Sequence, residues 1–317
     1  MNNEKIYDII IVGGGPGGLC AGMYAARANR TTICLEKVIP GGQISMTGEV
    51  EDYPGFEHIT GAELGSKFES HARKFGLEIA LEEVAEVYCE GEDRVVRCEG
   101  GNSYRAKVVI ISTGGTPVKL GIPGEVEYAG KGVSYCAICD GAFFKEKVIA
   151  VVGGGDAAVE EGGYLTKYGT KVHLIHRRDS LRAQKIIQQR AFDNPKMAFA
   201  FDTVVESING NDRQVTDLTL KNVKTGAISK LEIGAIFVYI GFTPNSKLVR
   251  EGLTLDAGGY IITNDRMETN IPGIFACGDV RAQLVRQVTN AVGDGTTAAV
   301  AAEKYIESLE DRHARRG

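Results

Sequence analysis

Two glycine-rich turns, far apart in the chain, each follow a short apolar run and open a helix-like stretch. The first turn, residues 13–18, comes after residues 6–12 (IYDIIIV) and contains G-x-G-x-x-G. The second, residues 153–158, comes after residues 147–152 (KVIAVV) and contains G-x-G-x-x-A. In such turns the glycines allow a tight reversal and let a pyrophosphate approach the helix N-terminus, while a small third residue lets helix and strand pack. Two dinucleotide-binding units are therefore predicted.

The segments around the two turns repeat one architecture. After the first turn, the pattern predicts a helix at 16–29, a strand at 31–36, a helix at 62–75 and a β-meander over 79–111 with a buried strand at 108–112. After the second, it predicts a helix at 156–168, a strand at 171–176 and a meander over 203–240 ending in a strand at 236–240. Residues 273–305 return to a strand and an alanine-rich helix, and the tail 311–317 is expected to fray. The predicted fold class is α/β, with two Rossmann-like, three-layer domains that each carry an added β-meander.

The residues that end the second strand of each repeat differ in charge. Glu36 stands there in the first repeat, and a carboxylate at that place bonds ribose hydroxyls and repels a 2′-phosphate. His176, Arg177 and Arg178 stand there in the second, and arginine forks suit a phosphate. The second site is therefore predicted to take NADP(H). The first could hold FAD or NAD, and a flavin there would complete a hydride relay.

Cys136 and Cys139 form a C-x-x-C pair followed by Asp140. A structural staple, half of a zinc site and a redox centre are all compatible with this spacing. The zinc alternative needs two further ligands, and the candidates His173 and His176 would lie on opposite faces of a strand. The redox alternative is favoured because C-x-x-C thiols exchange readily in a reducing compartment. Asp140 would then be a proton donor and acceptor, or simply a helix N-cap.

Composition and charge exclude several other classes of protein. The chain has 317 residues, seven cysteines and a net charge of -5. That charge provides no broad basic face for nucleic acid, and no apolar run is long enough for a membrane span. The odd, widely spaced cysteines do not suit a secreted disulfide framework. No nucleic-acid partner, no membrane association, no metal and a cytoplasmic location are expected.

Several of these motifs together resemble one known family. The run 136–141 (CAICDG), followed by residues 152–156 (VGGGD) and 176–182 (HRRDSLR), is similar to the low-molecular-weight thioredoxin reductases of bacteria. The likeness extends from Ile10 to about Ala301. It implies a discontinuous FAD domain at 1–117 and 246–317, an inserted NADPH domain at 118–245, and a homodimer. The crossovers at 113–117 and 241–245 would act as hinges.

The resemblance also implies which residues contact each cofactor. The FAD contacts expected from it are Gly13, Gly15, Pro16, Gly18, Glu36, Gly41, Gly42, Gln43, Thr113, Gly114, Asp279, Arg286, Gln287 and Val288. The NADPH contacts expected from it are Gly153, Gly155, Asp156, Ala157, His176, Arg177, Arg178 and Arg182. Asp52 also falls in an FAD-contacting segment. The family usually has Asn there, and a carboxylate cannot donate a hydrogen bond as an amide does.

The activity implied by the resemblance is thioredoxin-disulfide reduction. NADPH reduces FAD, FAD reduces the Cys136–Cys139 disulfide, and the dithiol reduces oxidised thioredoxin. Cys139 would be the thiol nearest the flavin, Cys136 would attack the partner, and Asp140 would handle the proton. The competing interpretations are a reductase for another redoxin, a dithiol oxidase, and a non-catalytic nicotinamide sensor. The first usually has an added N-terminal redoxin domain, and the second lacks the basic turn.

Overall fold

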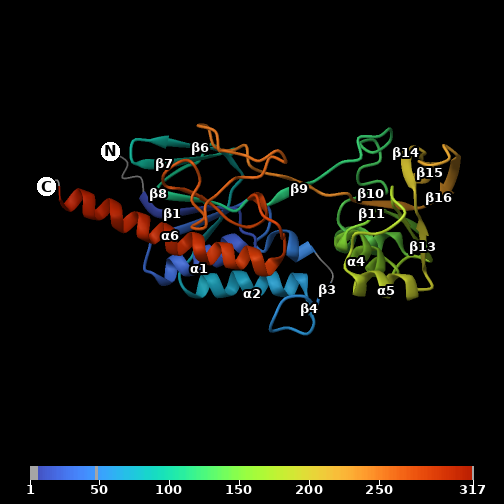
Figure 1. The fold of residues 1–317 in the computed structure, drawn as a ribbon, viewed down its shortest axis with the longest axis horizontal. Helices are drawn as coiled ribbons and strands as arrows, with labels where there is room; N and C mark the ends of the chain where they lie inside the picture. The colour runs from blue at the N-terminus through green and yellow to red at the C-terminus, as the bar shows by residue number, and fades with distance from the viewer. Residues whose placement is uncertain (1–5, 47–48, 316–317) are drawn as a thin grey trace. The chain divides into compact units, whose positions relative to one another are not determined.

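The structure, a computed structural model, describes residues 6–46 and 49–315, which divide into two compact units. Unit 1 is assembled from three segments of the chain, Met1–Ser45, Glu49–Thr116 and Thr243–Gly317. Unit 2 is the inserted segment Pro117–Phe242, with a short piece that begins at Met46. Each unit contains a parallel sheet with helices on one face and an antiparallel meander on the other (Figure 1).

The parallel sheet of unit 1 has the strand order β5-β2-β1-β8-β19. Its strands are β1 (Ile6–Val12), β2 (Thr32–Glu36), β5 (Glu78–Leu81), β8 (Ser103–Ile111) and β19 (Ile274–Ala276). The first half of β8 also pairs antiparallel with β7 (Asp93–Cys98), which pairs with β6 (Val84–Glu90). The long β8 therefore belongs to both the parallel sheet and the meander.

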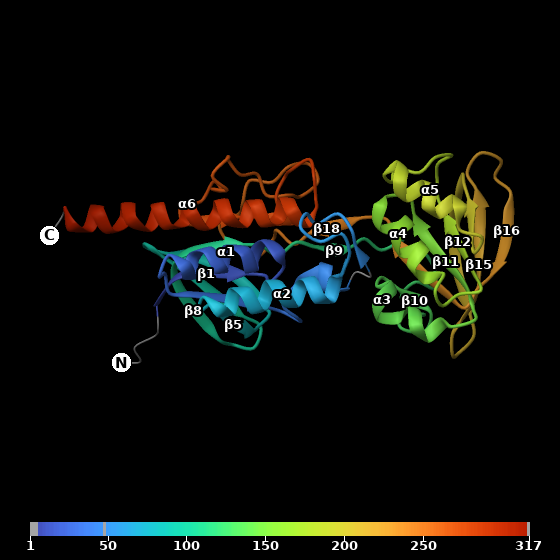
Figure 2. The same cartoon turned by 90° about the horizontal axis from the view of Figure 1, so that it is seen from below.

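Alternate residues of β1 point to two different cores in unit 1. Ile9 and Ile11 pack against α1 (Pro16–Arg27), α2 (Gly61–Lys74) and α6 (Val288–Ala314), which lie on one face of the sheet (Figure 2). Ile10 and Val12 pack against the meander on the other face. This period-two alternation explains why the strand reads as a continuous apolar run in the sequence.

Unit 2 repeats the arrangement with the strand order β10-β17-β11-β12-β13, all parallel. Its strands are β10 (Val133–Ser134), β11 (Val148–Gly153), β12 (Lys171–Ile175), β13 (Met197–Ala200) and β17 (Ala235–Tyr239). The helices α3 (Ala137–Asp140), α4 (Asp156–Leu165) and α5 (Lys185–Asp193) contribute to the core on one face. The meander of β14 (Thr203–Gly210), β15 (Val215–Asn222) and β16 (Ile228–Glu232) covers the other.

The remaining elements are short. They are η1 (Gly42–Met46), β3 (Glu49–Val50), β4 (Ile59–Thr60), η2 (Gly141–Phe144) and η3 (Gly278–Val280). The strands β9 (Gly115–Pro117) and β18 (Phe242–Pro244), where the chain enters and leaves the main segment of unit 2, pair with each other. Within the described residues, no helix combines the length and the apolar character needed to cross a membrane.

The α/β fold class and the principal elements are confirmed, with several differences. The meander predicted over 79–111 begins only at β6, because β5 pairs parallel with β2 in the main sheet. The helix α6 continues to Ala314, so the prediction that the tail frays from residue 311 is wrong for the described part. Ile306 and Leu309 are buried and anchor this last stretch to the core. The helix α5 and the strand β13 were not predicted from the sequence.

Candidate active site

The first glycine turn joins β1 to α1 and leaves no room for side chains at two of its positions. Gly13 has a φ of +100°, and a Cβ there would lie 2.4 Å from the Ser112 carbonyl oxygen. A Cβ at Gly18 would lie 2.0 Å from the carbonyl oxygen of Gly13. At Gly15, the N-cap of α1, a Cβ would meet nothing within 4 Å, and no side chain caps the helix. The turn thus leaves an open approach to uncapped amides, which fits a pyrophosphate.

Other predicted flavin residues converge on this turn from distant parts of unit 1. Gly41 donates its N–H to the Gly14 carbonyl oxygen at 2.8 Å. A Cβ at Gly13 would lie 3.1 Å from the Thr113 Cα atom. The side chain of Glu36 accepts the N–H of Gly14 at 2.7 Å, so this carboxylate lies beside the turn. The structure therefore brings together the turns at 13–18, 41–42 and 113.

The start of α6 also lies beside the first glycine turn. A Cβ at Gly17 would come within 3.0 Å of the Ala291 carbonyl oxygen and 3.5 Å of the Cys277 sulfur. Gln287 is the N-cap of α6, and Val288 packs with Val50 in a small apolar cluster. These contacts place the segments carrying the predicted residues 279, 287 and 288 near the turn.

The remaining flavin predictions fall on exposed or half-buried positions. Asp52 and Asp279 are exposed, and Arg286 lies over the ring of Tyr260 with its guanidinium carbon 3.8 Å from the ring centroid. Pro16 occupies the first turn of α1, where its missing N–H costs no hydrogen bond. Gly114 accepts the N–H of Asn245 at 3.0 Å, and Gln43 lies in η1.

The second glycine turn joins β11 to α4 in the same way. A Cβ at Gly153 would lie 2.3 Å from the Tyr239 carbonyl oxygen and 2.5 Å from the Cβ of Ala158. Gly155 is the N-cap of α4, has no side-chain cap, and has open space where a Cβ would be. Ala157 is exposed beside it. This turn also fits a pyrophosphate.

A basic loop is attached to the second glycine turn. The N–H of Arg182 donates to the Gly154 carbonyl oxygen at 2.7 Å, and Asp156 accepts the N–H of Gln184 at 2.7 Å. The side chains of Arg177, Arg178 and Arg182 are exposed, and none forms an ion pair with a carboxylate in the described chain. Asp156 thus holds the loop that presents three guanidinium groups, an arrangement suited to a phosphate ester.

His176 lies beneath this turn rather than in the basic cluster. A Cβ at Gly154 would come 2.3 Å from its ring, and the side chain is buried. Burial lowers the pKa of His176, and the charges of Arg182 and Arg178 lower it further. Its Nε2 atom is buried with no hydrogen-bond partner among the described residues. The imidazole is therefore neutral near pH 7 and supports the turn by packing.

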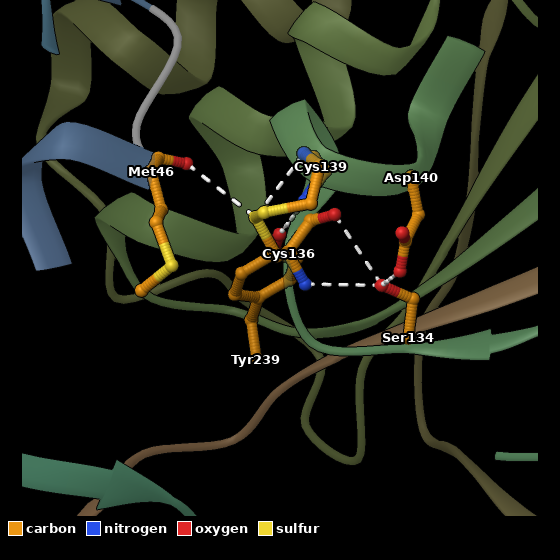
Figure 3. Close-up of a disulfide and its surroundings, with 7 residues drawn as sticks. Met46, Ser134, Cys136, Cys139, Asp140 and Tyr239 are labelled. Atoms are coloured by element: carbon orange, nitrogen blue, oxygen red, sulfur yellow. Dashed lines mark hydrogen bonds between the residues drawn. A yellow bond between two sulfur atoms is a disulfide. The ribbon is translucent and has the colours of Figure 1, made fainter. Parts of the chain in front are cut away.

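Cys136 and Cys139 are joined in a disulfide with their Cα atoms 5.4 Å apart (Figure 3). Cys136 is the N-cap of the short helix α3, and its sulfur accepts the N–H of Cys139 at 3.2 Å. Cys139 is exposed, whereas Cys136 is half-buried. The described chain has no group of three or more His, Cys, Asp or Glu residues that could hold a metal ion.

Ser134 and Asp140 flank this disulfide. The buried Ser134 hydroxyl donates to a carboxylate oxygen of Asp140 at 2.6 Å and accepts the N–H of Cys136 at 3.1 Å (Figure 3). Asp140 is the last residue of α3 and the N-cap residue of η2, but its half-buried side chain makes no cap hydrogen bond there. Ser134 therefore fixes the carboxylate next to the cysteine turn.

Two residues of this site were not found from the sequence. Besides Ser134, the hydroxyl of Tyr239 accepts the N–H of Ala137 at 2.8 Å (Figure 3). Burial raises the pKa of Tyr239, and the charges of Glu161 and Asp140 raise it further, so the phenol stays protonated. Tyr239 has no local signal, because it reaches the cysteine turn only through the strand pairing of unit 2. Ser134 lies two residues before Cys136, and the tendency of serine to bond nearby backbone N–H groups is the local signal that could have found it.

A scan of family models matches residues 7–295 to pyridine nucleotide-disulphide oxidoreductases. The chain belongs to this family. It is 49% identical over 98% of its length to thioredoxin reductase of Bacillus subtilis, covering 98% of that protein. It is 47% identical to the Listeria innocua thioredoxin reductase, over 98% of this chain and 97% of that one.

Solved structures of the family agree with the fold. A Lactococcus lactis thioredoxin reductase described as the FR conformation has a TM-score of 0.93 and 47% identity, covering 95% of this chain and 99% of that chain. A T. acidophilum thioredoxin reductase has a TM-score of 0.91 and 33% identity, covering 96% and 100%. The family assignment, the oxidoreductase class and the predicted cofactors FAD and NADPH are confirmed.

Proposed function

We propose that the chain is an NADPH-dependent thioredoxin-disulfide reductase. The observation that carries the proposal is the Cys136–Cys139 disulfide in the same unit as a glycine turn with exposed, unpaired guanidinium groups. The NADPH site would bind the electron donor, and the disulfide would pass the electrons to the substrate, so unit 2 has groups for the first and the last step of the reaction. The thioredoxin reductases that match the chain over nearly its whole length support the choice of substrate.

The two units divide the cofactors between them. We assign FAD to unit 1, with the domain at 1–117 and 246–317, and NADPH to unit 2, with the domain at 118–245. The open approach at Gly15 and the nearby Glu36 carboxylate support FAD in the first, because a ribose hydroxyl can bond that carboxylate. The open approach at Gly155 and the loop of Arg177, Arg178 and Arg182 support NADPH in the second. The other contacts expected from the resemblance are part of the same proposal.

The disulfide is the group that stores reducing equivalents in the protein. FAD, when bound, supplies hydride acceptance from NADPH and two-electron reduction of a disulfide. Reduction of the Cys136–Cys139 bond with two electrons and two protons gives a dithiol. The N–H of Cys139, which already bonds the Cys136 sulfur, stabilises a thiolate there, so Cys136 is assigned as the nucleophile.

Transfer to the partner then follows ordinary thiol–disulfide exchange. The Cys136 thiolate attacks the thioredoxin disulfide, which gives a mixed disulfide and releases one thioredoxin thiolate. Asp140, held by Ser134, takes the thiol proton of Cys136 and gives it to that leaving group. Cys139 then attacks the Cys136 sulfur and re-forms the intramolecular disulfide. Its thiol proton passes to the second thioredoxin thiolate, so that thioredoxin leaves as the dithiol.

The electron donor separates this proposal from a related activity. A structural relative from Clostridium acetobutylicum, described as a ferredoxin-flavin thioredoxin reductase, is 31% identical with a TM-score of 0.52 and covers 95% of this chain. The unpaired arginines at 177, 178 and 182 favour NADPH here, since a nucleotide 2′-phosphate would satisfy them.

The test is an anaerobic titration of the purified holoenzyme. NADPH should bleach the flavin absorbance, and oxidised thioredoxin should restore it. Reduced ferredoxin and NADH serve as alternative donors, and glutathione disulfide as an alternative acceptor. Bleaching by ferredoxin alone, or reoxidation by glutathione disulfide but no thioredoxin, would overturn the proposal.

A homodimer and a cytoplasmic location complete the proposal. The resemblance to the bacterial reductases supports the dimer, which light scattering would test by a mass twice that of the 34.0 kDa chain. The five free thiols beside an exchangeable disulfide suit a reducing compartment. Fractionation of cells expressing the chain would check that location.

A further inference from the structure

The amide of Ala137 lies between the two redox cysteines and cannot find an acceptor within its own helix. Ala137 is fully buried and is the first residue of α3, where helical N–H groups have no intrahelical partner. The N-cap side chain does not serve it either, because the Cys136 sulfur accepts the N–H of the third helical residue, Cys139, as N-cap side chains ordinarily do. The hydroxyl of Tyr239 is the acceptor for Ala137, at 2.8 Å.

Tyr239 is itself held by the strand that borders the second glycine turn. It is the last residue of β17 and pairs in register with Gly153, the last residue of β11. A Cβ at Gly153 would lie 2.3 Å from the Tyr239 carbonyl oxygen, so the two backbones are in close contact. The phenol therefore extends to the cysteine turn from the end of a central strand that is paired on both sides.

We propose that Tyr239 is a positioning residue that holds the first turn of α3 through Ala137 and thereby sets the disulfide–dithiol equilibrium of Cys136 and Cys139. The sulfur of Cys136 changes its bonding with the redox state, whereas the phenol does not. Of the acceptors for the N–H groups of Ala137 and Cys139, Tyr239 is thus the one that persists when the disulfide is reduced. Because burial raises the pKa of the phenol, its bond to Ala137 lasts through the physiological pH range.

The geometry predicts in which direction the loss of the Tyr239 hydroxyl shifts the disulfide–dithiol equilibrium. Closing the disulfide from the dithiol is intramolecular, so it is favoured when the fold already holds the two sulfurs close together. Anchoring Ala137 keeps the flanking Cα atoms near the 5.4 Å separation of the disulfide state. Without the phenolic oxygen the dithiol turn is looser, the disulfide is less favoured, and the pair is a weaker reductant.

The experiment measures the thiol–disulfide equilibrium of the full-length holoenzyme in glutathione buffers. One enzyme disulfide and two glutathione thiols give one enzyme dithiol and one glutathione disulfide. Thiols are trapped by alkylation, and the 136–139 peptide is quantified by mass spectrometry. Tyr239→Phe should lower the equilibrium constant for disulfide formation about 3- to 10-fold, because the bond costs less entropy in the already closed disulfide form and stabilises that form more, by up to the value of one buried hydrogen bond. A tenfold change corresponds to about 30 mV.

Tyr164→Phe is the matched control. Its hydroxyl bonds that of Tyr168 at 3.0 Å within the same unit, whereas the Ala137 N–H is bonded by Tyr239. An equilibrium constant for Tyr239→Phe within a factor of two of the wild-type value would overturn the proposal, as would an equal shift in Tyr164→Phe. The role of Tyr239 in catalysis rests on the proposed function, but its effect on the disulfide–dithiol equilibrium does not. The equilibrium needs neither thioredoxin nor NADPH, so the two can fail separately.

A measurement on the unmodified enzyme covers the case in which Tyr239→Phe does not fold. Amide hydrogen exchange with residue resolution should show Ala137 protected in both the disulfide and the dithiol forms. Exchange of the Ala137 amide at the rate of an unstructured peptide in the dithiol form would show that the phenol does not hold the turn, and would refute the role.

Discussion

The two redox cysteines differ in exposure although only two residues separate them. Cys139 is exposed, and Cys136 is half-buried with its sulfur bonded by a backbone N–H. Burial raises the pKa of the thiols of Cys20 and Cys34, which keeps these free cysteines unreactive. Of the cysteines, only the C-x-x-C pair is therefore assigned to the relay.

Replacing Cys139 with Ser should separate the two halves of the reaction. Flavin reduction by NADPH should continue, because it needs no sulfur. Turnover of thioredoxin should fall more than about 100-fold, because no intramolecular disulfide can form. Stopped-flow absorbance and a steady-state thioredoxin assay measure the two steps. The matched control, Cys89→Ser, removes a half-buried free thiol of unit 1 and should leave both rates unchanged. Turnover by Cys139→Ser near the wild-type rate would remove the pair from the mechanism.

Asp140→Asn should slow proton delivery while preserving the local geometry. An amide oxygen can still accept the Ser134 hydroxyl, but the amide cannot donate an acidic proton. The rate at which oxidised thioredoxin reoxidises the dithiol enzyme should fall about 100-fold, within the usual range for a general acid. Single-turnover kinetics measure it. A change confined to the flavin reduction step would argue against this role.

At the scale of elements, the two strand–turn–helix units are the parts that local sequence specifies best. β1, β2, β11 and β12 are short β-branched runs next to glycine turns, and their bounds match the prediction to within about two residues. The sequence analysis did not predict the helix α5 or the strand β13. β13 has only four residues, and α5 begins at Lys185 without a side-chain cap, so neither has a strong local signal.

The residues of the candidate site also divide into those that local sequence predicts and those that it does not. Motif spacing is sufficient to find both glycine turns, the basic loop and the cysteine pair. The bonds of Asp156 to Gln184 and of Tyr239 to Ala137 join residues far apart in the sequence and depend on which elements become neighbours. No periodicity in one stretch of sequence encodes such a pairing, because the partners are brought together by the sheet.

Replacing Gly18 or Gly15 of the first turn with Ala adds the same methyl group but should affect the stability of the apoprotein differently. Gly18→Ala places a Cβ 2.0 Å from a backbone oxygen, so the apoprotein should lose about 1–3 kcal/mol of unfolding free energy. Gly15→Ala meets no atom within 4 Å, so the apoprotein should keep its stability while FAD binds more weakly. Denaturant unfolding and flavin fluorescence titration measure the two effects. Equal destabilisation of the apoprotein by both changes would contradict the assignment of open space at Gly15.

The basic loop should determine the choice of nicotinamide. Arg178→Gln should raise the KM for NADPH about 10-fold, the low end for a hydrogen bond to a charged group, because the side chain is exposed. The KM for NADH should stay the same, since NADH has no 2′-phosphate. Arg213→Gln, an exposed arginine elsewhere in unit 2, is the control. A parallel loss for NADPH and NADH would mean that the loop does not contact the phosphate.

At the scale of the whole molecule, unit 2 has the features of an independently folding insertion. It has its own two apolar cores, one on each face of the β10-β17-β11-β12-β13 sheet. Its two ends are adjacent, because Val118 donates its N–H to the Gly241 carbonyl oxygen at 2.9 Å. A domain whose chain ends meet can be inserted into another without disturbing either core.

Residues 117–242, produced alone, should therefore unfold cooperatively in denaturant and bind NADPH without any flavin. The isolated segment should keep the Cys136–Cys139 disulfide, and dithiothreitol should convert it to two thiols. NADPH alone should release none, because the residues proposed to hold FAD all lie in unit 1 and a nicotinamide needs that relay to reach sulfur. Thiol titration after each reductant measures this directly. Thiols released by NADPH would show that unit 2 carries out reduction by itself, and a non-cooperative unfolding curve would show that its cores depend on unit 1.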